Sequence, residues 1–365
     1  MRKKKNSEPD MITIPHEKSF FISANGYSGF RSRHTVFYSS PQYTRVFVIT
    51  GGPGTGKSRL MYDVAKAAKL CRADVTYIRC SSDPDSLDGL VISKEGTRIA
   101  LLDGTAPHVR VIDYPGVIDE WIDLSLCWQT DALISKREEI LSATKRKQEA
   151  YARAYRFLSI AGDADRALDA ELRPAVLAEK LTRAVQREMR MLFPSAKPHS
   201  EEYYITACSM KGYTHLSTYR AESTVIGISD PYGGAHFYLD LLYRLLREQN
   251  AYTFLRFPSC YTDEKTENIY LPKSKILFSS ICCQDESKVI NMKRFLNAQA
   301  ITKNRSVLRH LLHVRRDMQD AACAALQEAG KHHFSLEEIY GNAMDFSKKE
   351  AVTERVKKQI TSLLA

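Results

Sequence analysis

The sequence predicts an α/β fold present in two tandem copies, each a parallel sheet flanked by helices and extended by a helical hairpin. Three observations predict it. Apolar runs with strand character alternate with amphipathic helical stretches, and the same landmarks recur in the same order in both halves of the chain. A glycine-rich turn follows the first strongly apolar run. Alternating strands and helices are typical of βαβ units, whose strands run parallel.

Length and composition agree with two globular domains. The 365 residues are 44% hydrophobic and 26% charged, which excludes the disordered and fibrous classes. No apolar run reaches the ~20 residues that a membrane-spanning helix needs, and the start lacks the apolar core of a signal peptide. The eight cysteines lack zinc-ligand spacing. We therefore expect a cytoplasmic protein with reduced thiols and no membrane partner.

The net charge of +10 favours anionic partners such as nucleotides, nucleic acid or an anionic surface. Part of the excess lies in a basic tail at residues 2–5, and much of the rest lies on stretches that also carry acidic residues. No zinc-finger or RNP-type motif supports a nucleic-acid module. Nucleic acid is therefore not the favoured partner, although the charge does not exclude it.

An internal repeat organises the chain. Phe21 matches Tyr204, 183 residues further on, and Leu158 matches Leu326, 168 residues further on. A duplication followed by small deletions would produce such a shrinking offset. Pro194, Ser195, Pro198 and Ser200 interrupt the helical pattern and mark the boundary between the copies near residues 194–199, which predicts domains at 1–195 and 196–365.

Both copies predict the same order of elements, with a helical tail at the end. A strand is followed by a turn, an amphipathic helix, a second strand, a polar loop and a third strand. In the first copy these are strands 46–50, 75–80 and 99–103 with helix 57–70; in the second they are strands 223–228, 252–257 and 276–280 with helix 235–248.

The helical tail of the first copy predicts a hairpin. Helical periodicity over residues 132–161 is interrupted at Gly162, and Pro174 is placed to open a second helix towards Phe193. In the second copy, capping-box patterns beginning at Ser335 and Ser347 predict the starts of the corresponding helices.

The turn after the first strand fits the pattern G-x-x-x-x-G-K-[ST], the phosphate-binding loop (P-loop), in the strand and helix context that the pattern requires. Its glycines let backbone N–H groups surround phosphate oxygens, and the following helix adds its positive dipole end. Lys57 is expected to reach the β- and γ-phosphates of a nucleotide and Ser58 to ligate Mg²⁺. The predicted binding residues are Gly51, Gly52, Pro53, Gly54, Thr55, Gly56, Lys57, Ser58 and Arg59.

A second Mg²⁺ ligand is expected at the end of a neighbouring strand. Asp103 closes the apolar run 99–103 and is the first choice for this role and, with Lys57, for catalysis. Asp113 is the alternative, in a D-x-x-G pattern that resembles the γ-phosphate-sensing loop of GTPases. No N/T-K-x-D guanine motif follows, so the sequence favours ATP with Mg²⁺ over GTP.

The group that positions the attacking water cannot be identified from the sequence. Gly104 stands where many P-loop ATPases carry a glutamate. Asp119, Glu120 and Asp123 lie downstream, where the start of an exposed acidic helix is the favoured interpretation. His108 could sense phosphate or act as a base, or it could be structural.

A polar loop at residues 81–89 follows the second strand. Its three aspartates and three serines could bind a cation or the hydroxyl groups of an acceptor, or they could form Asx-turns and a helix cap. Because the ends of parallel strands share one edge, this loop is expected beside the γ-phosphate.

The second copy carries an altered loop at residues 229–236. Ala235 replaces the lysine, His236 replaces the hydroxyl ligand, and Asp230 brings a negative charge into the loop. Ser279 stands at the position of the Mg²⁺ aspartate. We expect poor triphosphate binding there, and one nucleotide per chain.

Four segments together resemble a family of uncharacterised bacterial ATPases, mainly from Firmicutes, that are built from two P-loop halves and are sometimes labelled predicted nucleotide kinases. The likeness covers nearly the whole chain and implies ATP binding and a P-loop NTPase fold. Some relatives keep a working second loop, from which this chain departs. The segments are 51–58, 80–89, 103–108 and 114–116.

Three functions remain open from the sequence. An ATPase would use hydrolysis to drive a conformational change between the halves. A nucleotide or small-molecule kinase would transfer the γ-phosphate to an acceptor held near residues 81–89. A switch or scaffold would bind ATP without hydrolysing it and would act on a protein partner.

Overall fold

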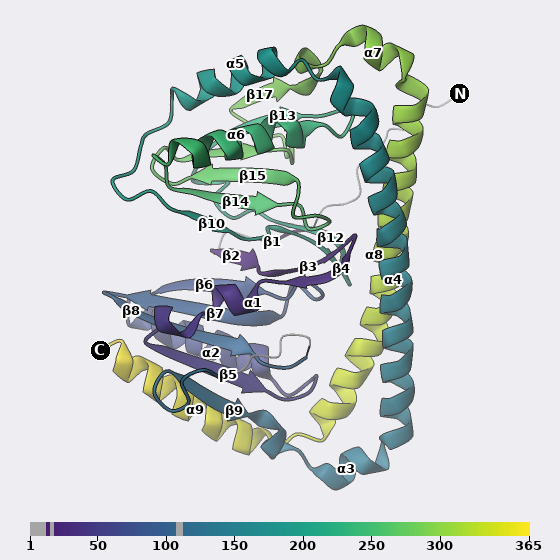
Figure 1. Ribbon diagram of the computed structural model, residues 1–365. Helices are drawn as coiled ribbons and strands as arrows, with labels where there is room; N and C mark the ends of the chain where they lie inside the picture. Colours follow the sequence, from purple (N-terminus) through teal and green to yellow (C-terminus); the bar gives the residue numbers. More distant parts are fainter. Residues whose placement is uncertain (1–11, 15–17, 107–111) are drawn as a thin grey trace.

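The computed structural model describes residues 12–14, 18–106 and 112–365. Two six-stranded sheets, one from each half of the chain, lie one above the other, and a pair of long helices runs beside both (Figure 1). The α/β class and the duplication predicted from the sequence are therefore confirmed. A small three-stranded sheet and a hairpin lie between the two large sheets; they comprise β1 (Ile12–Ile14), β12 (Gly212–Leu216) and β11 (Thr206–Ser209), and β3 (Ser23–Gly26) with β4 (Gly29–Ser32).

The first sheet is mixed, which corrects the prediction of a parallel one. Its strands are ordered β2 (Ser19–Phe21), β6 (Asp74–Arg79), β7 (Leu87–Lys94), β8 (Thr97–Asp103), β5 (Arg45–Thr50) and β9 (Asp119–Asp123). β5 is parallel to β8 and β9, whereas β7 is antiparallel to β6 and β8. The turn between β7 and β8 explains the difference, because Glu95 and Gly96 both have positive φ, as a two-residue hairpin turn requires.

The second sheet repeats this order and these directions strand for strand. Its strands are β10 (Ser200–Glu202), β14 (Phe254–Pro258), β15 (Thr266–Leu271), β16 (Ile276–Ser279), β13 (Thr224–Ser229) and β17 (Lys288–Asn291). In each half one helix follows the strand beside the last strand of the sheet: α2 (Lys57–Leu70) follows β5 and α6 (Ala235–Gln249) follows β13. Short helices complete the connections: α1 (His34–Phe37), α3 (Thr130–Ser135) and α7 (Ala298–Lys303).

The helical hairpin differs from the predicted one. α4 (Arg137–Leu172) runs unbroken through Gly162 and pairs along its length with α8 (Arg305–Asn342) from the other half. Gly162 therefore serves close packing rather than a helix end, since a Cβ there would lie 2.8 Å from Tyr27 Cβ. Ser335 lies inside α8 and begins no helix, and the last helix, α9 (Phe346–Leu363), is capped by Asp345.

The last helix of each copy packs against the other copy's sheet. α5 (Ala178–Met189), which precedes the predicted boundary at 195, shares a hydrophobic cluster with α6 and the second sheet. α9, at the end of the chain, packs on α2 and the first sheet. The two spatial halves are thus built from both parts of the sequence, because α4 and α8 carry the chain across from one half to the other.

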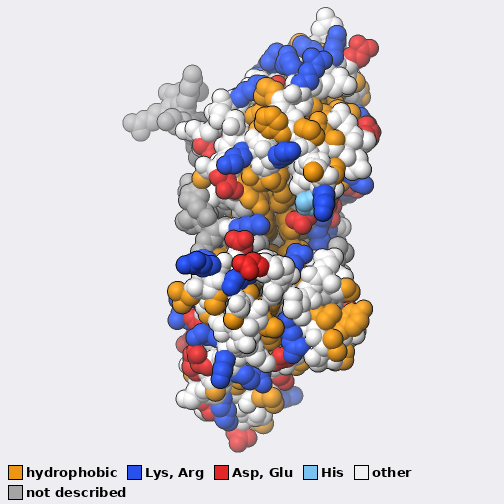
Figure 2. Space-filling view, turned by 90° about the vertical axis from the view of Figure 1, so that its left-hand side faces the viewer, with side chains coloured by type: hydrophobic (Ala, Val, Ile, Leu, Met, Phe, Trp, Pro, Cys, Tyr) orange, Lys and Arg blue, Asp and Glu red, His pale blue; other side chains and the backbone are white. Residues whose placement is uncertain are grey.

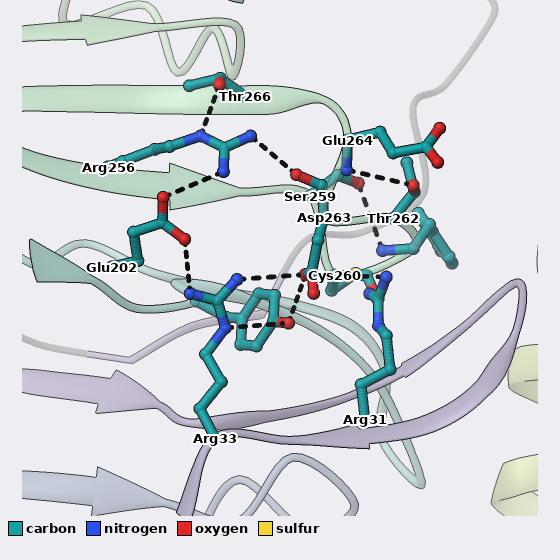
Figure 3. Close-up of polar contacts among 12 residues, drawn as sticks. Arg31, Arg33, Glu202, Arg256, Ser259, Cys260, Thr262, Asp263, Glu264 and Thr266 are labelled. Carbon is teal, nitrogen blue, oxygen red and sulfur yellow. Dashed lines mark hydrogen bonds and ion pairs between the residues drawn. The ribbon is translucent and has the colours of Figure 1, made fainter. Parts of the chain in front are cut away.

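One hydrophobic core spans both halves. It joins strands of both sheets to the inner faces of α4 and α8, with Phe20, Tyr204 and Leu326 among its buried side chains. A polar network supports the same seam (Figure 3): Arg33 lies 2.6 Å from Glu202 and 3.4 Å from Asp263 across it.

The seam opens into a pocket on the face away from the α4–α8 pair, where the molecule is visibly hollowed (Figure 2). The pocket has a volume of about 650 Å³ and mixed charge, with residues of both halves in its lining. Among the described helices, none combines the length and the apolar character that crossing a bilayer would require.

Candidate functional site

The glycine-rich loop lies between β5 and α2, as the sequence predicted. Gly51, Gly54 and Gly56 have φ values of 146°, 69° and 78°, which disfavour any side chain. Successive residues of this kind turn backbone N–H groups towards a common point and form an anion-binding concavity at a helix N-terminus. The local backbone therefore has the character that a phosphate site needs.

The lysine of the loop is turned back over the loop itself. Lys57 Nζ donates hydrogen bonds to the carbonyl oxygens of Gly51 at 3.0 Å and Gly52 at 2.9 Å. Its side chain is only 13% exposed. The ammonium group therefore lies against the concavity. Arg59, by contrast, extends along α2, where its Nε donates a hydrogen bond to Asp63 at 3.2 Å.

Asp103 lies beside this lysine. β8 is parallel to β5 with Asp103 opposite Ile49, which brings its carboxylate to within 3.6 Å of Lys57 Nζ. The Thr105 N–H donates to the same carboxylate at 2.8 Å. Burial raises the pKa of Asp103, while the charge of Lys57 opposes this rise. The predicted pair of lysine and aspartate is thus assembled.

The other acidic candidates take structural roles. Asp113 lies near the amino ends of β5 and β9, away from the loop at the carboxyl end of β5, because its N–H donates to Asp119, which pairs with Val46 at the start of β5. Asp119, Glu120 and Asp123 lie on a strand, not at the predicted start of a helix. Glu120 pairs with Arg45 at 2.8 Å, and Asp123 caps the short turn that follows. Asp113 is therefore not placed to ligate Mg²⁺ at the loop.

The segment after β6 reaches the loop through its backbone. The Leu87 N–H donates to Ser58 Oγ at 3.0 Å, so the hydroxyl expected on Mg²⁺ is held at the start of β7. Asp83 and Asp85 turn towards Lys211 of the other half. Asp88 is buried on β7, and its charge acts on Asp103. Residues 81–86 thus form a turn at the seam. Of the three aspartates in the polar loop, Asp88 is the one whose charge acts on Asp103.

One further expectation, the role of His108, falls on the segment 107–111, which lies outside the described residues. Arg79, the last residue of β6, donates to Tyr62 at 3.0 Å and to the Pro84 carbonyl oxygen, so it supports the turn that follows β6.

The junction of α8 and α9 covers the loop, a contact that no sequence pattern predicted. A Cβ on Gly52 would lie 3.1 Å from the Trp128 ring and 3.6 Å from Tyr340 of α8. A Cβ on Gly54 would lie 2.2 Å from the Glu337 carbonyl oxygen. The glycines are needed here for tertiary packing as well as for turn geometry.

A buried lysine of α9 completes this cover. Lys349 is 4% exposed, and its Cε would lie 3.3 Å from a Cβ on Gly56. Its only sequence signal is its spacing, because Lys349 lies four residues before Thr353 and seven before Val356, which are buried on the same face of α9.

The second copy's loop is already filled by its own carboxylate. Asp230 accepts hydrogen bonds from the Ala235 N–H at 2.7 Å and the Tyr232 N–H at 3.1 Å. His236 lies 3.3 Å from Asp169 of α4. The N–H groups that a phosphate would use are thus satisfied within the loop, which supports the expectation of poor phosphate binding there.

Within the described residues, no cluster of three or more His, Cys, Asp or Glu side chains could hold a metal ion alone. A cation at the first loop would therefore depend on the nucleotide for most of its ligands, as Mg²⁺ commonly does. When the chain was compared with family models, with curated proteins and with solved structures, none of the three comparisons found a match.

Proposed function

We propose that the chain binds one ATP with Mg²⁺ at residues 51–58 and hydrolyses it. The observation that carries the proposal is Lys57, the first residue of α2, lying over the glycine turn with its ammonium 3.6 Å from Asp103. A cation at a helix start and a carboxylate at the end of the neighbouring strand, beside an anion-binding turn, are the parts that triphosphate chemistry requires.

Each residue has a defined task in this proposal. Lys57 exchanges the two loop carbonyls for β- and γ-phosphate oxygens. Ser58 supplies a hydroxyl ligand to Mg²⁺, and Asp103 accepts hydrogen bonds from the water shell of the ion. Bound Mg²⁺ would neutralise charge that develops on the phosphates. The backbone N–H groups of the turn hold the triphosphate in register.

The α4–α8 pair offers a route for conformational change between the halves. α8 carries Glu337 at the first loop and Arg315 beside Gly233 in the second. These two residues are about 33 Å apart along a helix that rises ~1.5 Å per residue. A change at one loop therefore acts on an element that also contacts the other, which favours a mechanical ATPase.

A kinase is the second candidate, favoured by Asp88. This carboxylate is buried, and it lies close enough to Asp103 for its charge to raise the pKa of Asp103. It could accept a proton from an acceptor hydroxyl beside the γ-phosphate. ADP release that requires an added acceptor would identify a kinase, and phosphate release without an acceptor would identify an ATPase. If the protein binds ATP but releases neither product, it is a switch.

The Lys57→Ala variant tests the proposal. We expect it to lose measurable Mg²⁺·ATP binding and all turnover, because no other described cation is hydrogen-bonded to the loop. Lys66→Ala on the exposed face of the same helix is the matched control and should behave as wild type. A folded Lys57→Ala variant with unchanged ATP affinity would falsify the site assignment.

A further inference from the structure

Lys349 places a buried ammonium group against the phosphate-binding turn. It is the fourth residue of α9, which packs beside α2 on the first sheet (Figure 1). A Cβ on Gly56 would meet three atoms of this side chain, Cε at 3.3 Å and Cδ and Nζ at 4.0 Å. Gly56 is the N-cap of α2 and stands directly before Lys57. The end of the Lys349 side chain is therefore held at the start of a helix, where backbone N–H groups favour an anion.

The ammonium group of Lys349 has no close counter-ion among the described residues. The lysine is 4% exposed, so water screens its charge little. Its recorded ion pair is with Glu350 at 3.9 Å, which is beyond hydrogen-bond distance, and that carboxylate is 59% exposed. Buried charges are normally paired, because removing a charge from water is unfavourable. An anion at the loop would supply the close partner for Lys349.

The internal repeat allows a comparison at this position. The offset of 168 residues that relates Leu158 to Leu326 also relates the first residues of α5 and α9, and it pairs Lys349 with Leu181. Leu181 lines a pocket together with His236, at the start of α6. The two helices bury matching positions, namely 181, 185 and 188 in α5 and 349, 353 and 356 in α9. The half with the intact loop thus has lysine where the half with the altered loop has leucine.

We propose that Lys349 is a second cation for the phosphates of a nucleotide bound at residues 51–58. The proposal rests on the proposed function and deepens it, because residues 196–365 then contribute a side chain to the site. The two lysines reach the loop from different elements, Lys57 from the start of α2 and Lys349 from α9. Opposite charges attract strongly where water is excluded, so the second lysine strengthens binding and its own charge becomes paired.

Calorimetric titration of Mg²⁺·ATP into full-length Lys349→Met and Lys348→Met tests the proposal. Methionine keeps an unbranched side chain and removes the charge, so Lys349→Met should bind ATP at least about tenfold more weakly than wild type, the value of one charge-assisted hydrogen bond. Lys348 is the neighbouring residue with a side chain that is 68% exposed, and its variant should retain the wild-type dissociation constant. Wild-type affinity in a folded Lys349→Met variant would overturn the inference.

The melting temperature without nucleotide separates binding from packing. Lys349→Met should melt at or above the wild-type temperature, because a buried charge with a distant partner is removed. A lower melting temperature with unchanged ATP affinity would show that the lysine serves the fold, and it would overturn the inference. Lys349→Leu, with the side chain of the matching position in α5, should give the same two results as Lys349→Met. Failure of both variants to fold would also overturn the inference.

The proposed function can fail separately from this inference. If the folded wild-type chain does not bind Mg²⁺·ATP, the proposed function is overturned and the second cation with it. If Lys57→Ala loses binding while wild type and Lys349→Met bind ATP equally, the second cation alone is overturned.

Discussion

Asp103 combines a functional position with an unfavourable environment. Its carboxylate is buried next to Lys57, and burial raises its pKa above the ordinary value. When folding raises the pKa of an acid, ionisation of that acid is less favourable in the folded chain than in the unfolded chain. The stability of the fold therefore declines as pH rises through the pKa that the acid has in the folded chain. The charge of Asp103 therefore costs stability, as expected if the residue serves the Mg²⁺ role that we propose for it.

The Asp103→Asn variant should separate these two properties. We expect weaker dependence of turnover on Mg²⁺ and a lower rate, because the ligand to the water shell is lost. Its melting temperature at neutral pH should equal or exceed that of wild type, since a buried charge is removed while the Thr105 N–H keeps an acceptor. Asp113→Asn is the control, because Asp113 is exposed and lies away from the loop, near the amino end of β9. A large loss of stability in Asp103→Asn with normal turnover would contradict this assignment.

Glu267 should give the fold a pH dependence near neutrality. It lines a pocket of about 600 Å³ beneath the α4–α8 pair and accepts a hydrogen bond from Thr206 at 2.8 Å. Burial raises its pKa from 4.5 to about 7. The folded chain therefore holds a proton that the unfolded chain releases, so stability present below pH 4.5 is lost as pH rises to about 7.

Denaturant unfolding across that pH range measures this effect. Glu267→Gln should flatten the decline and be more stable than wild type at pH 8, while Glu264→Gln, at an exposed neighbour, should follow the wild-type curve. Parallel curves for wild type and Glu267→Gln would show that the carboxyl group is ionised at its ordinary pKa.

At the scale of elements, sequence patterns predicted the helices and strands whose stability comes from contacts between residues close in the sequence. β5, α2, β6 and β8 have strong apolar periodicity and were placed within a few residues. β9 was missed because three of its five residues are acidic, and its pairing with β5 is a contact between distant segments. The second helix of the predicted helical hairpin was wrong for the same reason, because α4 packs against α8, which lies more than a hundred residues further along the chain.

Gly162 of α4 and Gly330 of α8 should differ in their tolerance of a methyl group. A Cβ on Gly162 would meet Tyr27 Cβ at 2.8 Å and Cγ at 2.9 Å, close to the backbone of a buried hairpin. On Gly330 it would meet the flexible Met210 at 3.1 Å or more. We expect Gly162→Ala to lower the free energy of unfolding by about 1–3 kcal/mol, the usual cost of overpacking.

Gly330→Ala serves as the matched comparison for that substitution. Alanine gains helix propensity of about 1 kcal/mol over glycine at either position, so the difference between the variants isolates the packing term. Equal stabilities of the two variants, measured by denaturant titration, would mean that the Tyr27 contact yields freely and that Gly162 has no packing role.

At the scale of the whole molecule, the chain connects its two loops through shared elements. The geometry of the glycine-rich turn was predicted because its residues are contiguous and several have a local reason, a positive φ or a helix start. Its cover was not, because Trp128, Glu337 and Lys349 come from segments far along the chain. Only the crossing of α4 and α8 brings them together, and no local pattern records that crossing.

The central claim is that this molecule has one nucleotide site, in its first half. Calorimetric titration of the full chain with Mg²⁺·ATP measures this directly, because it returns both affinity and stoichiometry. We expect one ATP per chain, since the second loop lacks the lysine and its N–H groups are satisfied by Asp230. Two sites of similar affinity, or no binding to folded protein, would contradict the claim.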